Sequence, residues 1–497
     1  MCKNGIKGAS TAAVTVESGN INVTSANNGL ASDGSVLVKG GTLNSTSGND
    51  AIKSEPDEGD EDSACTVSIT GGNIIINAGG DGIQSANDLT VTGGTFDITS
   101  GGGYTAEIDD DTSAKGIKSD KDVIITGGDF TINSADDSVH SNGNVRITGG
   151  IFSINSGDDG VHADYTLKIG DESGNATPAI TVYNAYEGFE GAEIYLYSGI
   201  GAITTSDDGI NSANSDLMGY SFVLEIDGGS WYINAEGDGI DSNGSIVMNG
   251  GEAVVFGPSM EDNSAVDYET NFDVNGGKIF AIGMSRMATV PTKGAYVAFG
   301  TNGMGGINGM PNGEMPKGHR PDDGGFAPIE RPTGGRPDDG GFKPDGNNTS
   351  SVSIKAGDTV TIKDSKGNVI VTTTAVRTAD SVVYALVDEN ETYSLYINDV
   401  NVSDNGEVTP DPTQTATENT ASNSSEAPTS VVSETSTTSI ANNTNSTTSN
   451  NTTSSNTVSG NTGAVNTGSK YVVMNIAFVM LLSGIIALIM KKRQRSF

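Results

Sequence analysis

The chain has 497 residues, a formal net charge of -37 and 68 glycines, while Phe, Trp and Tyr together make up only 6% of it. A charge this negative argues against nucleic acid as a ligand, because phosphate binding needs clustered Lys and Arg. Abundant glycine with few aromatics disfavours a large globular core and favours a turn-rich β protein. Cys2 and Cys65 are too few for a disulfide framework and receive no role.

An internal repeat dominates residues 1–300. The segment VIITGGDFTINSADDSVHS begins at Val123, and VRITGGIFSINSGDDGVHA begins at Val145, 22 residues later. Each copy reads as a strand, a Gly-Gly turn, a second strand with alternating apolar residues, an Asp/Asn-Gly turn and a short third strand. The repeat predicts an all-β fold for residues 1–300, a parallel β-helix of about eleven three-sided coils.

Alternation assigns sides to the strands. Phe96, Phe130, Phe152 and Trp231 share one register after the Gly-Gly turn and should stack inward. After the second turn an apolar residue points inward, so the residue that follows it should point outward. We call this the outward column, and it reads Lys7, Lys53, Gln84, Lys118, His140, His162, Glu190, Asn211 and Asp241.

Three regions of different composition follow the repeat. Residues 301–349 are rich in Gly, Pro and Asp, with two copies of RPDDGGF, which predicts a disordered insertion. Residues 350–403 regain strand character and predict a small β-subdomain that caps the end of the β-helix. Residues 404–468 are almost wholly Ser, Thr, Asn, Pro and Ala, which is typical of a stalk.

The end of the chain predicts a membrane anchor. Residues 471–490 are mostly apolar and long enough to cross a bilayer as a helix, and the basic tail at 491–497 places that end in the cytoplasm. We therefore expect a single-pass, monomeric protein with its β-helix on the extracellular face. AVNTG ahead of the span is faintly similar to a sortase signal, but plain membrane anchoring is favoured. This topology requires a secretion signal, so we expect the natural protein to begin earlier, with further coils.

The acidic turns are the first candidate for chemistry. A step of 22 residues stacks Asp136 and Asp137 against Asp158 and Asp159. Four such charges would repel one another unless a cation such as Ca²⁺, which takes six to eight oxygen ligands, lay between them. The other candidate metal ligands are Asp81, Asp207, Asp208 and Asp238. The competing interpretation is that Asp, Asn and Gly simply form good turns.

The outward column offers two further candidates. A divalent metal could bridge His140 and His162, although a stacked polar ladder on a solvated face is the favoured interpretation. Lys118 could serve as the proton-abstracting base of a lyase. A single Lys on a polar strand face is more often ordinary soluble surface.

The repeated DGI-x-S turn and the ITGG-x-F-x-I strands resemble the clostridial family of carbohydrate-binding domain-containing proteins. The resemblance covers residues 1–300 and, through AGDTVTIKDSKGNVI and ETYSLYI, the subdomain. It implies a Ca²⁺-binding right-handed parallel β-helix, similar to family 9 polysaccharide lyases, that binds plant cell-wall polysaccharide. The motif position implies the Ca²⁺ role for Asp81, Asp137, Asp159, Asp208 and Asp238. Ser138 departs from the motif, which has Gly there.

These observations lead to one functional prediction and two rivals. We expect calcium-dependent, non-catalytic binding of plant cell-wall polysaccharide, either acidic pectic glycan or cellulose. Tyr183, Tyr186, Tyr195, Tyr197 and Tyr232 could add a modest aromatic platform. The enzyme rival is a pectate lyase with Lys118 as its base. The structural rival is an adhesin or spacer in which Ca²⁺ only stiffens the turns.

Overall fold

The computed structural model describes residues 3–8, 12–56, 65–109, 112–260, 263–300, 352–402 and 408–411. These residues form strands and no helix, and none of them belongs to a helix that could cross a membrane. The expected insertion, the span at 471–490 and the basic tail lie outside the described residues, as does nearly all of the expected stalk.

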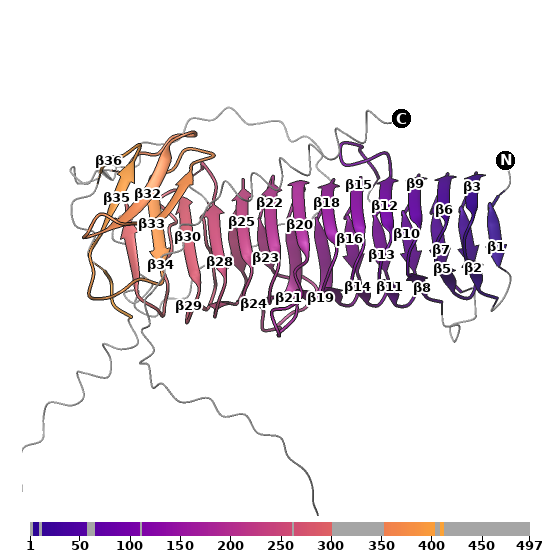
Figure 1. The fold of residues 1–497 in the computed structure, drawn as a ribbon, viewed down its shortest axis with the longest axis horizontal. Coiled ribbons are helices and arrows are strands. Elements are labelled where there is room, and N and C mark those ends of the chain that lie inside the picture. The colour runs from indigo at the N-terminus through magenta and orange to yellow at the C-terminus, as the bar shows by residue number, and fades with distance from the viewer. Residues whose placement is uncertain are drawn as a thin grey trace, which may run out of the picture.

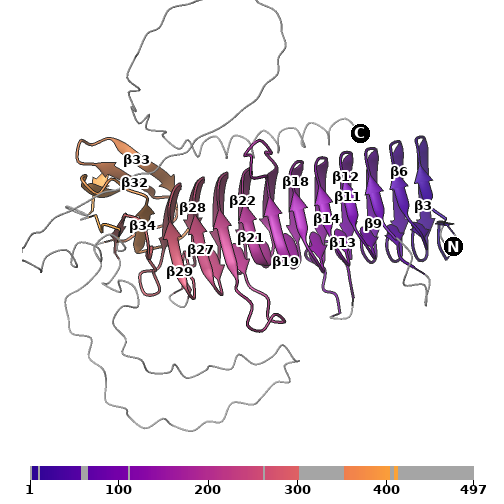
Figure 2. The same cartoon turned by 90° about the horizontal axis from the view of Figure 1, so that it is seen from below.

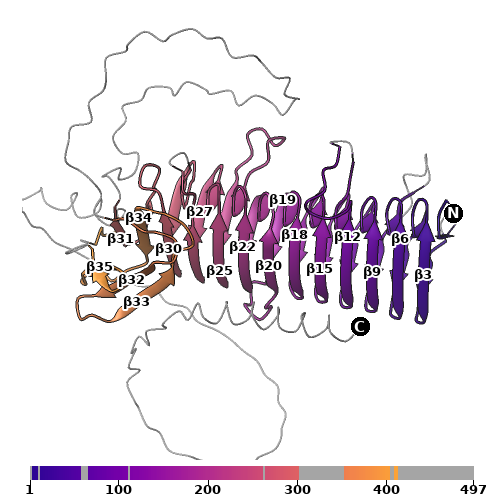
Figure 3. The ribbon, with the colours of Figure 1, turned by 90° about the horizontal axis from the view of Figure 1, so that it is seen from above.

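The described part of residues 1–300 is a right-handed parallel β-solenoid of about ten turns (Figure 1). This confirms the predicted fold class. The expected number of about eleven coils is one more than this. Figures 2 and 3 show the same rod from two further sides, with successive turns stacked along its long axis.

Each turn contributes a strand to each of three parallel ladders. The first ladder follows the acidic turn and contains β1 (Ile6–Gly8), β4 (Leu30–Ser32), β7 (Ile52–Ser54), β10 (Ile83–Ser85), β13 (Ile117–Ser119), β16 (Val139–Ser141), β19 (Val161–Ile169), β21 (Phe189–Leu196), β23 (Ile210–Ser212) and β26 (Ile240–Ser242). The second contains β2 (Val14–Val16), β5 (Val36–Val38), β8 (Val67–Ile69), β11 (Leu89–Val91), β14 (Val123–Ile125), β17 (Val145–Ile147), β24 (Val223–Ile226), β27 (Ser245–Met248) and β29 (Asn271–Val274). The long strands β19 and β21 run through both ladders.

The third ladder holds the longer strands that follow the Gly-Gly turns. It contains β3 (Asn20–Ser25), β6 (Thr42–Ser47), β9 (Asn73–Ala78), β12 (Thr95–Ser100), β15 (Asp129–Ser134), β18 (Ile151–Ser156), β20 (Ala179–Asn184), β22 (Ile200–Thr205), β25 (Ser230–Ala235), β28 (Glu252–Phe256) and β30 (Lys278–Gly283). The second glycine of the turn adopts a positive φ, for example 130° at Gly128, which a residue with a Cβ rarely adopts. The repeated Gly-Gly pair is therefore a backbone requirement of the corner.

The core is the predicted inward stack. Phe96, Phe130 and Phe152 occupy equivalent positions, and successive ring centroids lie 4.5 Å apart. Trp231 continues this register and is fully buried, as expected. The apolar residues that precede the outward column are buried as well, as at Ile117 and Val139. Ladder pairing then aligns every residue of the outward column, with Ala31 between Lys7 and Lys53.

Residues 352–402 lie at the C-terminal end of the rod (Figure 1). Strand β34 (Ser381–Ala385) pairs antiparallel with both β30 and β31 (Tyr296–Phe299), which extends the third ladder past its last parallel strand. A separate sheet contains β32 (Thr359–Asp364), β33 (Val369–Thr374), β35 (Tyr393–Ile397) and β36 (Val400–Asn401). These strands share a second apolar cluster with Phe256 and Phe280 of the rod. The last turn is therefore covered by the chain itself.

Candidate functional site

The acidic turns form a ladder of side-chain to main-chain hydrogen bonds. Oδ1 of Asp50 accepts from the N–H of Asp81 at 3.0 Å, and Oδ1 of Asp137 accepts from the N–H of Asp159 at 3.0 Å. Asp208 accepts in the same way from the N–H of Asp238 at 2.6 Å. One carboxylate oxygen of each turn thus links two coils, which supports the structural role that Asp was expected to have in turns.

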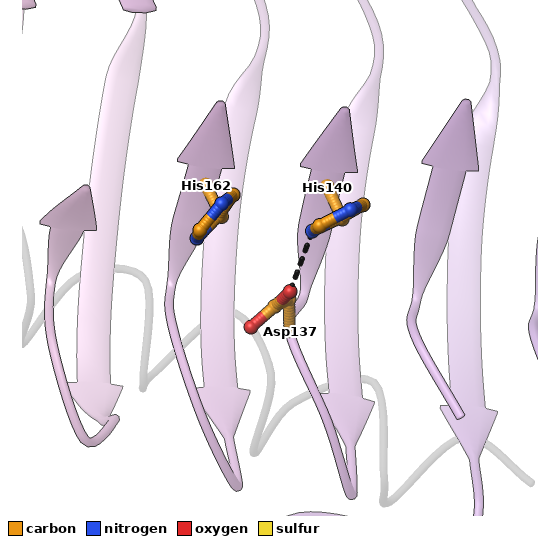
Figure 4. A group of neighbouring side chains, drawn as sticks. All are labelled: Asp137, His140 and His162. Atoms are coloured by element: carbon orange, nitrogen blue, oxygen red, sulfur yellow. Dashed lines mark hydrogen bonds and ion pairs between the residues drawn. The ribbon is translucent and has the colours of Figure 1, made fainter. Parts of the chain in front are cut away.

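The other carboxylate oxygen faces the residue three positions later, in the outward column. Oδ2 of Asp137 lies 2.7 Å from Nδ1 of His140, and Oδ2 of Asp159 lies 2.9 Å from Nδ1 of His162. Figure 4 shows Asp137 with the two histidines on neighbouring coils. The same spacing joins Asp50 to Lys53 at 3.0 Å. Turn and column therefore act as one double row of polar groups along the rod.

We call the middle of this double row the histidine segment: Lys115, Lys118, Asp136, Asp137, His140, Asp158, Asp159 and His162. Nζ of Lys115 lies 2.7 Å from Asp136 and 2.7 Å from Asp137. Burial acts to lower the pKa of Lys115, but the charges of Asp137 and Asp136 outweigh it and raise that pKa. Two of the four stacked carboxylates thus have a protein cation between them, the place where the sequence predicted Ca²⁺.

Asp137 is the most engaged carboxylate of this segment. Its side chain is 4% exposed and contacts Lys115, His140 and the N–H of Asp159. Burial acts to raise the pKa of Asp137, but the hydrogen bond with His140 and the charge of Lys115 outweigh it and lower that pKa. A buried carboxylate with this many partners is held in one position.

Lys118, the candidate lyase base, lies in the outward column between Gln84 and His140. Its Nζ donates to Oγ of Ser113 at 3.3 Å, and its charge acts on the nearby Asp81. Asp81 itself accepts from Ser113 and from the N–H of Lys115. Lys118 therefore belongs to a polar network across three turns.

Further along the rod lies what we call the carboxylate segment: Glu187, Glu190, Asp208, Asn211, Asp238, Asp241 and Asp267. Residues 169–277 contain no Lys, Arg or His, so any basic neighbour of this segment comes from another part of the chain, as His162 does at Glu190. Asp238, Asp241 and Asp267 each offer an oxygen, and these oxygens lie within 4.8 Å of one another. Burial, with the charges of Asp208, Asp267 and Asp241, raises the pKa of Asp238 to about 8.

Two buried oxygens of this segment have no hydrogen-bond partner within the described residues. They are Oε2 of Glu187 and Oδ1 of Asn211. Nδ2 of Asn211 donates to the other oxygen of Glu187 at 3.1 Å, so the two side chains touch. Burial, then the charges of Glu190 and Asp208, raise the pKa of Glu187 to about 9. Such acceptors are costly to bury unless a ligand satisfies them.

The structure therefore divides the eight predicted metal ligands. Asp136, Asp137, Asp158 and Asp159 lie together beside Lys115, and Asp81 is one turn away in its own network. Asp208 and Asp238 lie together in the carboxylate segment. Asp207 is in the turn beside Asp208, where its side chain hydrogen-bonds the hydroxyl of Tyr186.

Sequence reasoning missed four partners in this arrangement. The reach of Lys115 to Asp136 and Asp137 was not predicted. Glu187, Asn211 and Asp267 were not considered as ligands. The i to i+3 pairing of turn and column, together with the lack of basic residues in 169–277, would have drawn attention to them.

A cleft of about 380 Å³ lies where the two segments meet. It is lined by His162, Asp164, Tyr165, Glu190, Asn214, Ser215, Asp216 and Leu217. Nδ2 of Asn214 donates to the main-chain oxygen of Asp164 at 2.8 Å, which ties the loop after β23 to β19. The ring of Tyr165 is 45% exposed. An open polar cleft with one exposed aromatic ring suits a sugar unit.

The expected tyrosine platform does not form as one surface. Tyr195 and Tyr197 stack with centroids 5.9 Å apart at the end of β21. Tyr183 belongs to β20 in the third ladder, and Tyr186 lines a different cleft of about 320 Å³ with Tyr104. Tyr232 packs against Phe256, next to the capping strands. The five tyrosines are therefore split between the end of β21, two separated strands of the third ladder and the turn after β20.

Comparison with known proteins supports one part of the chain. Residues 1–160 match the model of a family described as carbohydrate-binding domain-containing protein. The resemblance to that family is therefore confirmed over this range. No curated protein and no solved structure matches the chain. The similarity to family 9 polysaccharide lyases stays a prediction.

Proposed function

We propose that the protein is a cell-surface, calcium-dependent binder of plant cell-wall polysaccharide without catalysis. The main support for calcium binding is a pair of buried oxygens, one on Glu187 and one on Asn211, which lack hydrogen-bond partners within the described residues. They lie in a row of carboxylates in which the local sequence supplies no cation, and this row borders the cleft. The match of residues 1–160 supplies the ligand class.

The carboxylate segment fits Ca²⁺ by the chemistry of its donors. Ca²⁺ takes six to eight oxygen ligands from carboxylates, side-chain amides, main-chain carbonyls and water. Glu187 and Asn211 would supply a carboxylate and an amide oxygen, with Asp208 and Glu190 close enough to act on the charge of Glu187. Asp238, Asp241 and Asp267 would supply a second set. The bound ion would neutralise carboxylates that now raise one another's pKa.

The histidine segment fits Ca²⁺ less well. Lys115 already lies between Asp136 and Asp137, so a Ca²⁺ ion between these two carboxylates would face its ammonium group at close range. Imidazole nitrogens are also poor ligands for this hard cation. We therefore place the calcium role of the acidic turns on Asp208 and Asp238, with Glu187, Asn211, Asp241 and Asp267, rather than on Asp136 to Asp159.

Acidic pectic glycan is the ligand that this arrangement favours. A uronate chain would be repelled by a protein with a net charge of -37 unless cations lay between the carboxylates of both partners. A cation held beside the cleft could bind the sugar carboxylate while Tyr165 packs against a ring face. Cellulose is less favoured because the exposed tyrosines do not form one flat row.

Surface attachment completes the proposal. The apolar stretch at 471–490 and the basic tail at 491–497 support a single membrane span with the rod outside the cell. A rod with an open cleft beside a row of oxygen ligands could then hold wall polysaccharide next to the cell.

The test is retention of the full chain on polygalacturonate, cellulose and a neutral control, with Ca²⁺ and with chelator, while unsaturated uronide is followed by ultraviolet absorbance. We expect chelator-sensitive retention on polygalacturonate and no absorbance change. Glu187→Gln should lose retention, whereas Asp129→Asn, the same kind of change on an exposed residue of β15, should keep it. Rising absorbance would instead make the protein a lyase, and retention on no glycan would favour the adhesin.

A further inference from the structure

The two stacked histidines are arranged for a different metal from the one proposed above. The rings of His140 and His162 lie on consecutive coils with centroids 4.8 Å apart and planes 23° apart (Figure 4). In both residues Nδ1 faces a carboxylate of the turn. A ligand atom of Asp137, one of His140 and one of His162 lie within 4.8 Å of one another.

The other ring nitrogen of each histidine, Nε2, lies within hydrogen-bonding distance of a side-chain oxygen. Nε2 of His140 lies 2.7 Å from Oδ1 of Asn142, and Nε2 of His162 lies 3.1 Å from Oδ1 of Asp164. These side-chain oxygens accept from Nε2–H, so Nδ1 is the ring nitrogen that would bind a metal once its own proton has left. Metal-binding histidines usually have such a partner on the nitrogen that does not bind the metal.

The oxygen donors around Nδ1 are also held in place. Asp137 accepts from the N–H of Asp159 with one oxygen and contacts Lys115 and His140 with the other. Glu190 approaches Nδ1 of His162 to 2.5 Å. Nitrogen and oxygen atoms this close share a proton. In a tetrahedral zinc site with bonds of about 2.0–2.1 Å, the ligand atoms are about 3.3 Å apart. The ligand atoms of Asp137, His140 and His162, which lie within 4.8 Å of one another, would therefore have to move closer together to bind zinc.

We infer that Asp137, His140 and His162 form a binding site for a divalent transition metal such as Zn²⁺, with Glu190 as a fourth ligand. The ion replaces the protons that the Nδ1 atoms now share with carboxylates, so binding releases protons to solvent. Asp137 is held in place, so the approach from 4.8 Å to ligand distance would come from the rings of His140 and His162, whose side chains are 12% and 19% exposed. Two imidazoles with carboxylates suit Zn²⁺, Ni²⁺ or Cu²⁺ rather than Ca²⁺.

Charge and access are compatible with this site. The two imidazole rings are surrounded by the carboxylates of Asp137, Asp159, Glu190, Asp136 and Asp158, and the ammonium groups of Lys115 and Lys118 offset only part of this negative charge. His162 and Glu190 line the wall of the open cleft, which gives the ion a path from solvent. The inference does not depend on glycan binding, since it rests on contacts among protein side chains alone.

The test is calorimetric titration of the full chain with Zn²⁺ in buffer that contains excess Ca²⁺. We expect a Zn²⁺ site that Ca²⁺ does not displace and that releases protons, seen as heats that differ between buffers of different ionisation enthalpy. His140→Ala with His162→Ala should abolish it, and Asp164→Asn should weaken it by about 10–100-fold. Cobalt bound there should show visible absorption bands of nitrogen ligation.

The matched control is His319→Ala, a change to the chain's third histidine, which lies outside the described residues. This variant should keep the Zn²⁺ site. Equal Zn²⁺ affinity in wild type and the double variant, with both folded by circular dichroism, would overturn the inference. Loss of the site in the double variant with glycan retention intact would support it and leave the proposed function untouched.

Discussion

The histidine segment and the carboxylate segment occupy the same corner of one solenoid, yet they solve the problem of stacked acidic turns differently. In the first, Lys115 and the two histidines bring positive or hydrogen-bond-donating groups against Asp136, Asp137 and Asp159. In the second, residues 169–277 provide no cationic side chain, and buried oxygens of Glu187 and Asn211 have no hydrogen-bond partner in the part of the chain that the structure describes. The fold sets where charges stack, and local side chains decide whether an external cation is needed.

The largest effect should come from removing the ammonium group of Lys115, which would make the histidine segment resemble the carboxylate segment. Lys115→Met should destabilise the protein by about 3–5 kcal/mol without divalent ions, because it leaves Asp136 and Asp137 buried without their partner. Chemical denaturation measures this loss. Added Ca²⁺ should recover part of it, because the histidine segment would then resemble its neighbour. A variant as stable as wild type in chelator would show that Lys115 does not hold these charges.

Calcium itself should give the next largest effect. At a concentration of about 100 times its dissociation constant, Ca²⁺ should stabilise the folded chain by about 2.7 kcal/mol for each site. Glu187→Gln removes a charged ligand and should lose most of the gain from its site, whereas Asp129→Asn should keep it. Thermal unfolding with and without Ca²⁺ provides the comparison. Equal gains in both variants would place the ion elsewhere.

The sequence predicts which residues of the two segments are stacked, but it does not predict every contact between them. The 22-residue offset and the alternation of the strands placed His140 beside His162 and stacked Phe152 on Phe130, because a periodic backbone repeats its neighbours. The reach of Lys115 to Asp136 could not be read in this way, since a long side chain is not bound by the period. The pairing of β34 with β30 was also inaccessible, because it is antiparallel and joins distant segments.

The pH dependence of stability should come from the carboxylate segment. The pKa of Glu187 rises from 4.5 to about 9 and that of Asp238 from 3.8 to about 8 on folding, so the folded state holds protons that the unfolded chain has lost. Their contribution to stability is present below the unfolded pKa and is lost as pH rises through the folded pKa. In chelator, the melting temperature should therefore fall by at least about 2 °C from about pH 5 to pH 9.

Added Ca²⁺ should reduce the fall of the melting temperature with pH, because it takes the place of the protons on the same carboxylate oxygens. The matched variant Glu187→Gln should flatten it even in chelator, since Gln remains neutral across this range. A melting temperature that rises with pH in chelator would contradict the assignment of the unpaired carboxylates to this segment.

The smallest effect should come from Lys118, which separates the binder from the lyase. Its Nζ has a long contact to Ser113, and it lies in the outward column, where a substitution should change stability by no more than about 0.5 kcal/mol. Lys118→Ala should keep calcium-dependent glycan retention. A wild-type chain that releases unsaturated uronide, and a variant that does not, would establish the lyase instead.

The central claim is that Ca²⁺ binds the carboxylate segment and not the stacked carboxylates beside Lys115. The most direct measurement is the anomalous diffraction signal of crystals of the chain grown with Ca²⁺. We predict ions against Glu187 and Asn211 and against Asp238, Asp241 and Asp267, with Lys115 still between Asp136 and Asp137. An ion in contact with Asp137 and a displaced Lys115, or no ion in the carboxylate segment, would contradict the account.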